Sequence, residues 1–299
     1  MCGTLFFGSE QQAAAAMVDP RIMDDRQTTP LGHWGLERWP FPSVPGAAQF
    51  YPTAGHDEAL ARIEYLVAAR RRLGVLLGES GIGKSTLVGI AARRLARSGK
   101  AVVTIDTLGL SARDLLWHIA AGLRTAPQAD ADASRLWRLI ADRVVENRLQ
   151  QIDTVLLLDD AGQAGPDVLT QVARLARLDS SPDARWSMVL TAEPSQAAHW
   201  NGSLRDLVDL RIEVEPWELE DTIGFVQTAL VEAGSTGPLF EDDALATLHE
   251  ISGGVPRQVS RLADFALLAG AMAKVDRVDA ELVRAAGDEV AWPEVASAY

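Results

Sequence analysis

The stretch that decides the fold is Gly78-Glu79-Ser80-Gly81-Ile82-Gly83-Lys84-Ser85-Thr86. An apolar run over 73–77 precedes it and a helix-like run over 87–96 follows it, which is the order strand, glycine-rich turn, helix. The turn has the G-x-x-x-x-G-K-[ST] spacing, in which glycines let successive backbone N–H groups line an anion-sized hollow. The helix that follows adds its unpaired N-terminal N–H groups and the positive end of its dipole. We therefore predict a phosphate-binding loop over 78–86.

Two side chains of this loop have predicted roles beyond the backbone. Lys84 is expected to reach the β- and γ-phosphates, and the Ser85 hydroxyl is expected to coordinate Mg²⁺. The sequence therefore predicts a site for a nucleoside triphosphate and its metal ion.

Composition limits the classes of function. The 299 residues are 47% hydrophobic, enough for a large core and two domains. The net charge of −13 opposes nonspecific nucleic-acid binding, which depends on Lys and Arg, so nucleic acid is a disfavoured partner. A single cysteine fits a reducing compartment. No apolar run reaches the roughly 18–20 residues of a membrane span and the N-terminus lacks a signal-peptide pattern, so we expect a cytoplasmic protein.

The rest of the chain predicts an α/β domain followed by helices. Apolar runs expected to form strands lie at 101–106, 152–158, 186–191 and, as an edge strand, 210–214, with helices expected at 57–72, 111–123, 133–150 and 166–178. Strands that alternate with helices give a parallel sheet sandwiched by helices. Beyond Pro216 the pattern is purely helical, over 220–233, 241–251, 256–273 and 279–289. We expect a nucleotide-binding domain over 31–215 and a small all-helical lid domain over 216–299.

The N-terminal part has two expected segments. Residues 1–30 mix glutamines, alanines and acidic pairs, which predicts a poorly ordered tail. Residues 31–56 combine prolines with aromatic side chains, so they are expected to lack regular structure. Two readings stay open for this strap: it packs on the surface of the nucleotide-binding domain, or it lies near the nucleotide base.

Acidic side chains follow the strand expected at 152–158. Ligands of an open α/β sheet bind beyond the carboxyl ends of its strands, so Asp159 should emerge beside the phosphate-binding loop. A carboxylate there can hold Mg²⁺ directly or through water. Asp160 stands one position further on, where it could act as a general base or orient water.

Four further residues are candidates around the phosphates. Thr191 ends the next strand and could bind the attacking water or the γ-phosphate, although threonine is also an ordinary strand residue. Arg205 or Arg211 could reach a neighbouring subunit's nucleotide as an arginine finger, or could be surface residues. Arg257 follows Gly254-Val255-Pro256 at a helix start, where the dipole disfavours a cation, so its placement suggests a phosphate partner.

With these elements in order, the sequence resembles the AAA+ ATPases of the general secretion pathway protein A type, whose relatives include ATPase subunits of transposition systems. The match runs over most of 33–290. Besides the two acidic and glycine-rich motifs, it is carried by Trp34-Gly35-Leu36, Pro40-Phe41, Tyr51, His56-Asp57-Glu58-Ala59-Leu60, Leu136-Trp137, Leu239-Phe240 and Gly254-Val255-Pro256-Arg257.

The resemblance implies a P-loop AAA+ fold, ATP with Mg²⁺, and homo-oligomeric rings or filaments with ATP or ADP at the interfaces. It places Lys84 and Ser85 in Walker A, and Asp159 and Asp160 in Walker B. It also places Thr191 at sensor 1, Arg211 near the finger position and Arg257 at sensor 2.

Three departures from the family pattern bear on function. Asp160 stands where the family usually has Glu, and a misplacement of about 1 Å can cost about 10²-fold in rate. Thr191-Ala192-Glu193 replaces a more usual Gly-Gln pair. Secretion-pathway members often continue into a membrane span and a peptidoglycan-binding region, which this sequence lacks, so the secretion role is not expected to follow from the ATPase module.

Two functions remain in view. The first is a Mg²⁺-dependent ATPase that couples nucleotide state to lid movement, self-assembly or partner recruitment. The alternative is a slow or non-hydrolysing nucleotide-gated module that recruits a secretion component, a transposase or DNA. A small-molecule kinase is a third reading, which the helical lid makes the weakest.

Overall fold

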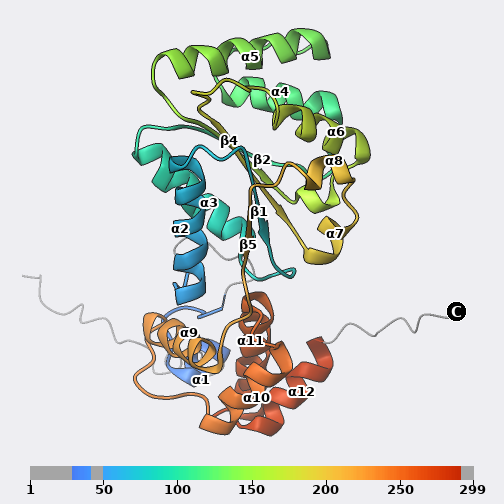
Figure 1. Cartoon of the computed structure of the whole chain (residues 1–299). Helices are drawn as coiled ribbons and strands as arrows, with labels where there is room; N and C mark the ends of the chain where they lie inside the picture. Colours follow the sequence, from blue (N-terminus) through green and yellow to red (C-terminus); the bar gives the residue numbers. More distant parts are fainter. Residues whose placement is uncertain (1–28, 42–49, 291–299) are drawn as a thin grey trace, which may run out of the picture.

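The computed structural model describes residues 29–41 and 50–290, in two parts joined beside the phosphate-binding loop (Figure 1). Of the tail expected over 1–30, residues 1–28 lie outside the described residues, and Pro30 already belongs to a helix. The expectation that residues 31–56 lack regular structure is wrong at its start, because α1 (Pro30–Trp34) is a short helix. Pro30 occupies a first-turn position, the Thr29 hydroxyl accepts a hydrogen bond from the Gly32 N–H, and Gly35 ends the helix in the left-handed region.

The first part is built on a five-stranded sheet with the order β2-β3-β4-β1-β5. All neighbouring strands are parallel, as predicted. The strands are β1 (Leu73–Leu77), β2 (Ala101–Asp106), β3 (Thr154–Asp159), β4 (Trp186–Ala192) and the edge strand β5 (Leu210–Glu213). β1 and β4 are buried along their whole length, which explains their continuous apolar sequence.

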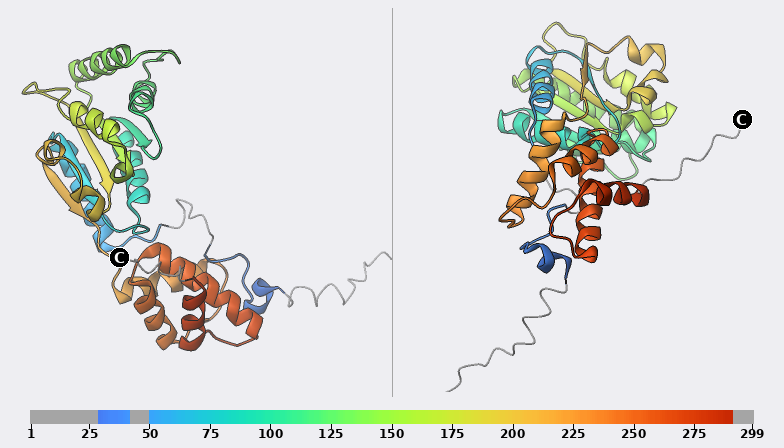
Figure 2. Two further views of the ribbon diagram at one scale, coloured as in Figure 1. Left: turned by 90° about the vertical axis from the view of Figure 1, so that its right-hand side faces the viewer. Right: turned by 90° about the horizontal axis from the view of Figure 1, so that it is seen from below.

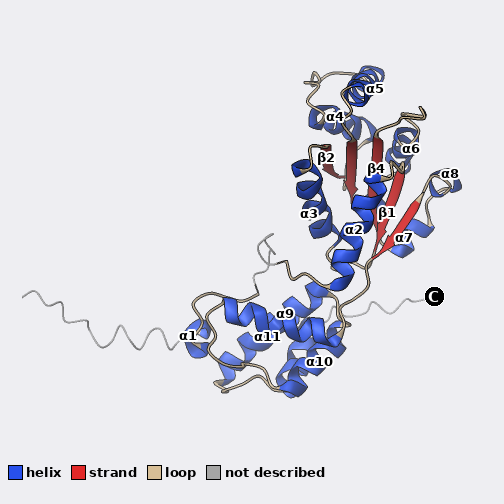
Figure 3. Ribbon diagram, turned by 60° about the vertical axis from the view of Figure 1, so that its left-hand side comes forward, coloured by secondary structure: helices blue, strands red, loops and turns tan. Residues whose placement is uncertain are grey.

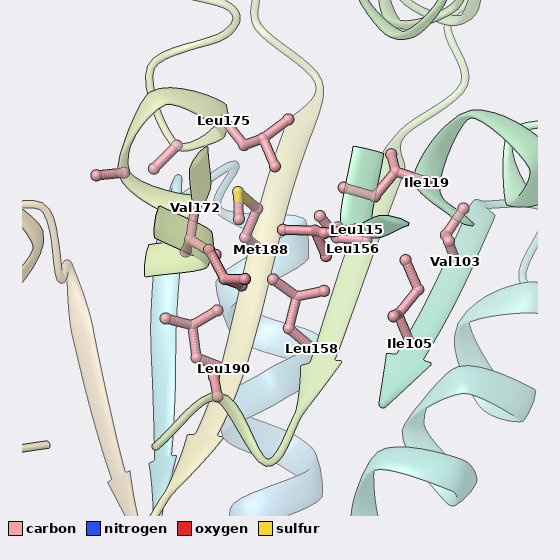
Figure 4. Close-up of a cluster of buried hydrophobic side chains, with 14 of the residues drawn as sticks. Val103, Ile105, Leu115, Ile119, Leu156, Leu158, Val172, Leu175, Met188 and Leu190 are labelled. Atoms are coloured by element: carbon pink, nitrogen blue, oxygen red, sulfur yellow. The ribbon is translucent and has the colours of Figure 1, made fainter. Parts of the chain in front are cut away.

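Helices cover both faces of this sheet (Figure 3). On one face, α2 (Ala54–Ala68) and α3 (Lys84–Arg97) bury leucine, isoleucine and valine side chains against the sheet. On the other face lie α4 (Ala112–Gly122), α5 (Ala133–Leu149) and α6 (Pro166–Leu175), and Figure 4 shows Leu156, Leu158 and Met188 of the sheet facing this helical layer. The structure confirms the predicted α/β sandwich.

The ends of some elements differ from the sequence prediction. α2 begins three residues earlier than expected because Thr53 caps it. Short helices that the sequence pattern did not indicate follow β3 and β4: η2 (Ala161–Gln163), α7 (Pro194–Ala198) and α8 (Gly202–Arg205).

The second part is all-helical, as predicted. It consists of α9 (Leu219–Glu232), α10 (Asp242–Ser252), α11 (Pro256–Ala273) and α12 (Ala280–Val290), which Figure 2 shows grouped apart from the sheet. These helices share an apolar core of their own. The change from α/β to helical structure falls between β5 and α9. In this segment the backbone N–H of Trp217 donates to the Gly254 carbonyl at 2.9 Å. The division into two domains near 215–217 remains our prediction.

The aromatic strap corrects one expectation. Residues 30–41 pack on the helical part, not on the nucleotide-binding domain to which the sequence analysis assigned them. The Trp34 indole N–H donates to the Leu267 carbonyl at 2.9 Å, and Trp39 hydrogen-bonds the Asp264 carboxylate. A Cβ at Gly270 would lie 2.8 Å from the Trp34 ring, so a glycine on α11 makes room for it. The rings are placed here because this surface offers both an apolar groove and acceptors for their N–H groups.

Candidate functional site

The glycine-rich loop has the backbone that its sequence predicts. Gly81 and Gly83 have φ values of 85° and 105°, in the region that side chains disfavour. Gly78 is required for a different reason, since a Cβ there would lie 2.7 Å from Ile82 Cγ2 and 3.1 Å from the Val214 carbonyl oxygen. The loop therefore curls between the end of β1 and the start of α3, with its backbone packed too closely for larger residues.

Lys84 is the first residue of α3, and its side chain folds back over the loop. Its Nζ atom donates to the carbonyl oxygens of Gly78 and Glu79, each at 2.8 Å. Burial lowers the pKa of the Lys84 ammonium, and the nearby carboxylates Glu193, Asp160 and Asp159 act in the opposite direction. The lysine is thus a cation held inside the curl of the loop and surrounded by acids. Ser85 and Thr86 continue the first turn of α3, where unpaired backbone N–H groups are available to an anion.

The two Walker B residues lie at the carboxyl end of β3. Asp159 pairs in register with Asp106 of β2, so acids from neighbouring strands meet at one edge of the sheet. Asp160 follows with φ 52° and ψ 31°, a left-handed conformation that turns the chain into η2. Burial raises the pKa of the Asp160 carboxyl, and the negative charges of Asp159 and Asp106 raise it further.

Thr191 lies near the end of β4, as expected, and faces the two acids that follow β3. Its hydroxyl is fully buried, donates to Asp159 Oδ1 at 2.5 Å and accepts from the Asp160 backbone N–H at 2.8 Å. The hydroxyl therefore bonds both Asp159 and the backbone of Asp160 and fixes their relative placement, and a role of Thr191 toward water or phosphate remains a prediction. In this structure Thr191 is a positioning residue.

Arg257 lies against the phosphate-binding loop, as its sequence position suggested. Its backbone N–H donates to the Gly81 carbonyl at 3.2 Å, and its guanidinium lies 3.5 Å from the Ser80 hydroxyl. A Cβ at Gly81 would lie 2.8 Å from the Arg257 Cβ. The start of α11 and the loop are therefore in direct contact, and Arg257 joins the helical part to the site.

The two candidate finger arginines lie elsewhere. Arg205 ends α8, and Arg211 lies on the edge strand β5. Arg211 lines a hollow of about 530 Å³ with α2 and the segment that leads into α9. Neither arginine contacts the loop among the described residues, and a role toward a neighbouring subunit's nucleotide remains a prediction.

Two residues that had no predicted role at the site lie close to the loop. Glu193 follows β4 and, of the charged groups near Lys84, has the strongest effect on its ammonium. His56 is buried on α2 with its Nε2 atom 3.5 Å from where a Gly83 Cβ would lie, and its ring is 5.1 Å from Phe50 and 6.4 Å from Trp217. Burial lowers the pKa of the His56 imidazole. Only tertiary structure shows the contact of His56 with the loop.

The residues present fit a magnesium nucleotide. The loop offers a glycine cradle that a Cβ would fill, Ser85 offers a hydroxyl, and Asp159 offers a carboxylate oxygen besides the one bonded to Thr191. Among the described residues there is no group of three or more His, Cys, Asp or Glu side chains that could hold a metal. Mg²⁺ in phosphate sites usually takes one or two protein ligands and fills the rest of its shell with phosphate and water.

The sequence and the fold were compared with those of known proteins. Residues 68–200 match the AAA domain family. The chain superposes on Cdc6p from Pyrobaculum aerophilum with a TM-score of 0.62 at 19% identity, over 84% of this chain and 70% of that one. It superposes on the Thermotoga maritima RuvB Holliday junction branch migration motor with a TM-score of 0.53 at 16% identity, over 84% and 73% of the two chains. The chain has the fold of the P-loop AAA+ proteins.

A sequence relative indicates which kind of AAA+ protein the chain resembles. The chain is 30% identical to general secretion pathway protein A of Aeromonas hydrophila over 240 residues, which are 79% of this chain and 44% of that protein. The resemblance stated from the motifs is thereby confirmed. The chain spans less than half the length of that relative. No helix among residues 29–41 and 50–290 is long and apolar enough to cross a membrane.

Proposed function

We propose that the protein binds ATP with Mg²⁺ at the phosphate-binding loop and hydrolyses it to ADP and phosphate. The observation that carries this proposal is the convergence of Lys84, Asp160 and Arg257 from three distant parts of the chain on one glycine cradle. Each is a group that phosphoryl transfer requires: a cation for the phosphates, a carboxylate for water and a second cation on the lid.

Each side chain of the site would have its own role in ATP binding and hydrolysis. The loop amides and Lys84 bind the β- and γ-phosphates, with Lys84 leaving the Gly78 and Glu79 carbonyls to do so. Ser85 and Asp159 would hold Mg²⁺, which when bound neutralises charge on the phosphate oxygens. Asp160 orients the attacking water, and Thr191 fixes both Walker B residues through its two hydrogen bonds. Arg257 contacts the γ-phosphate from α11.

The contact between α11 and the loop supports coupling to the helical part. Arg257 bonds the loop through its backbone, so a change in the loop on nucleotide binding moves the start of α11. The aromatic strap is bonded to the same helix through Trp34 and Leu267, so it would move with it. We propose that this movement controls self-assembly into a ring or filament, with Arg205 or Arg211 facing a neighbouring subunit's nucleotide. Light scattering with and without ATP and Mg²⁺ tests the assembly: an unchanged mass would refute it.

A second function is favoured by one observation. Asp160 has a side chain one methylene shorter than Glu and a left-handed backbone, which favours slow hydrolysis. ATP would then act as a conformational ligand that recruits a partner. The relative's name points to a secretion component, and a similar chain, the Aeropyrum pernix ORC1 protein, is described in complex with DNA, with a TM-score of 0.60 and 17% identity over 85% of this chain and 69% of that one. The net charge of −13 disfavours DNA for the free monomer.

Phosphate release measured with Lys84→Ala tests the proposed hydrolysis. The variant removes the cation from the cradle and should abolish turnover, whereas Lys274→Ala, a change of the same type in the turn after α11, should leave turnover unchanged. Equal turnover in Lys84→Ala and the unmodified protein would refute the proposal. Tight ATP binding with a single burst of phosphate and no steady turnover would favour the second function.

A further inference from the structure

Carboxylates that follow two neighbouring strands, β3 and β4, lie near enough to Lys84 to act on its charge. Asp160 follows β3 and Glu193 follows β4, and Glu193 is the stronger of the two in its effect on the lysine. The proposed function gives Asp160 a role and leaves Glu193 without one. A carboxylate this close to the phosphate-binding lysine needs an account, because its charge would repel a triphosphate.

The backbone fixes where Glu193 stands. β4 is hydrogen-bonded to β1, and Ala192 is opposite Leu77 in the register. One residue further, the Gly78 N–H donates to the Ala192 carbonyl at 3.3 Å. Glu193 therefore follows the end of β4 beside the point at which the phosphate-binding loop follows the neighbouring strand β1.

A capping box holds Glu193 in this place. Its carboxylate accepts the backbone N–H of Gln196, and its own N–H donates to Gln196 Oε1 at 3.1 Å. Gln196 packs over Gly162, where a Cβ would lie 2.0 Å from that same Oε1 atom. A carboxylate has about four lone-pair sites, so the cap leaves acceptor capacity on Glu193. The side chain is thus both anchored and able to accept a further hydrogen bond.

Glu193 is also better suited than Thr191 and Asp160 to reach a water molecule. Thr191, on the same strand end, has its hydroxyl committed to Asp159 and Asp160. The Asp160 carboxylate is shorter than that of Glu193 by one C–C bond, about 1.5 Å. Resting on the proposed hydrolysis and extending it, we propose that Glu193 is a catalytic residue, the carboxylate that accepts a proton from the attacking water while Asp160 helps to orient that water.

The step balances without any further reactant. The water oxygen forms a bond to the γ-phosphorus as the bond from that phosphorus to the β,γ-bridging oxygen breaks. The bridging electron pair leaves with ADP, and the water proton passes to the Glu193 carboxylate and from there to phosphate or solvent. A second carboxylate in this position offsets the short reach of Asp160.

Glu193→Gln tests the proposal, because glutamine keeps an oxygen for the Gln196 cap and removes only the charge. We expect turnover to fall by at least tenfold, measured as phosphate release in single-turnover conditions with protein in excess. The dissociation constant of ATP with Mg²⁺ should fall severalfold or stay unchanged, because a negative charge beside the phosphates is removed. A purely structural role would weaken binding and lower the melting temperature instead. Glu146→Gln, which removes an exposed carboxylate on α5 paired with Arg143, is the matched control and should change neither quantity.

Each result decides between the claims. Turnover in Glu193→Gln within twofold of the unmodified protein would overturn the role of Glu193, and a large loss in Asp160→Asn in the same assay would leave the proposed hydrolysis standing. Lower turnover together with weaker ATP binding and a lower melting temperature would also overturn it, as the effect of a damaged cap. No phosphate release from the unmodified protein would overturn both the Glu193 role and hydrolysis, while nucleotide binding could still be measured separately.

Discussion

Replacing Thr191 by valine should destabilise the protein even though the two side chains have nearly the same shape. Thr191 is fully buried, and its hydroxyl makes one hydrogen bond to the Asp159 carboxylate and one from the Asp160 backbone N–H. A hydrogen bond to a charged group contributes about 1.5–3 kcal/mol, and a buried N–H left unpaired costs about 1–3 kcal/mol. Asp160 is only half-buried and water can reach part of its backbone, so the two costs do not add fully. We expect Thr191→Val to lower the free energy of unfolding by about 2–3 kcal/mol.

Urea unfolding of the nucleotide-free protein, followed by circular dichroism, measures this loss as a shift in midpoint at constant slope. Thr191→Ser keeps the hydroxyl and loses only a methyl group, so it should cost about 1 kcal/mol or less. The two variants should also differ in hydrolysis, since valine frees the Walker B residues and serine does not. An unchanged midpoint in Thr191→Val, or equal losses in the valine and serine variants, would refute the positioning role.

Three further predictions follow from the loop and the strap. Gly81→Ala forces a side chain into a φ of 85° and against Arg257, so it should cost more than the roughly 1–2 kcal/mol of a left-handed residue, whereas Gly89→Ala within α3 should be neutral or stabilising by thermal unfolding. His56 has a folded-state pKa below its ordinary value, so the unfolded chain binds more protons and stability should fall as the pH drops through about 6.5. His56→Asn should flatten that dependence in urea titrations at pH 5 to 8, and an unchanged slope would contradict the burial argument. Trp34→Ala should cost about 3–5 kcal/mol of unfolding free energy in the helical part, which a loss below 1 kcal/mol would contradict.

The sequence predicted the sheet and the loop because these elements carry strong local signals. A strand buried on both faces reads as a continuous apolar run, and the 78–86 spacing reflects the backbone that a phosphate needs. The fold and most of the helices could therefore be predicted without coordinates. The order of strands in the sheet, with β4 between β3 and β1, has no local signal and comes only from tertiary packing.

The candidate site was predicted in part. The positions of Lys84 in the cradle and of Arg257 against the loop agree with expectation, since motif spacing and a helix start place them. For Thr191 the sequence left open a contact with water or phosphate and an ordinary strand role, and the structure places its hydroxyl between Asp159 and Asp160 because β3 and β4 are neighbours. Glu193 could have been selected as a site residue if the pairing of β4 with β1 had been known, because this pairing places the end of β4 beside the loop.

The surface that buries the aromatic strap could not be predicted from the sequence. Tryptophans and prolines indicated burial but not the surface that buries them, and both domains offered apolar faces. The decisive partners are backbone carbonyls and small residues on α11, such as Leu267 and Gly270, which leave no signature in the strap itself. The same holds for His56, whose contact with the loop depends on how α2 packs beside α3.

The most direct test of the central claim is calorimetric titration of the protein with ATP and Mg²⁺. The account predicts saturable binding at one site per chain, and its loss in Lys84→Ala, a variant that removes the cation of the cradle. Absence of binding in the unmodified protein, or equal binding in the variant, would contradict the claim that a metal-bound triphosphate occupies the glycine loop.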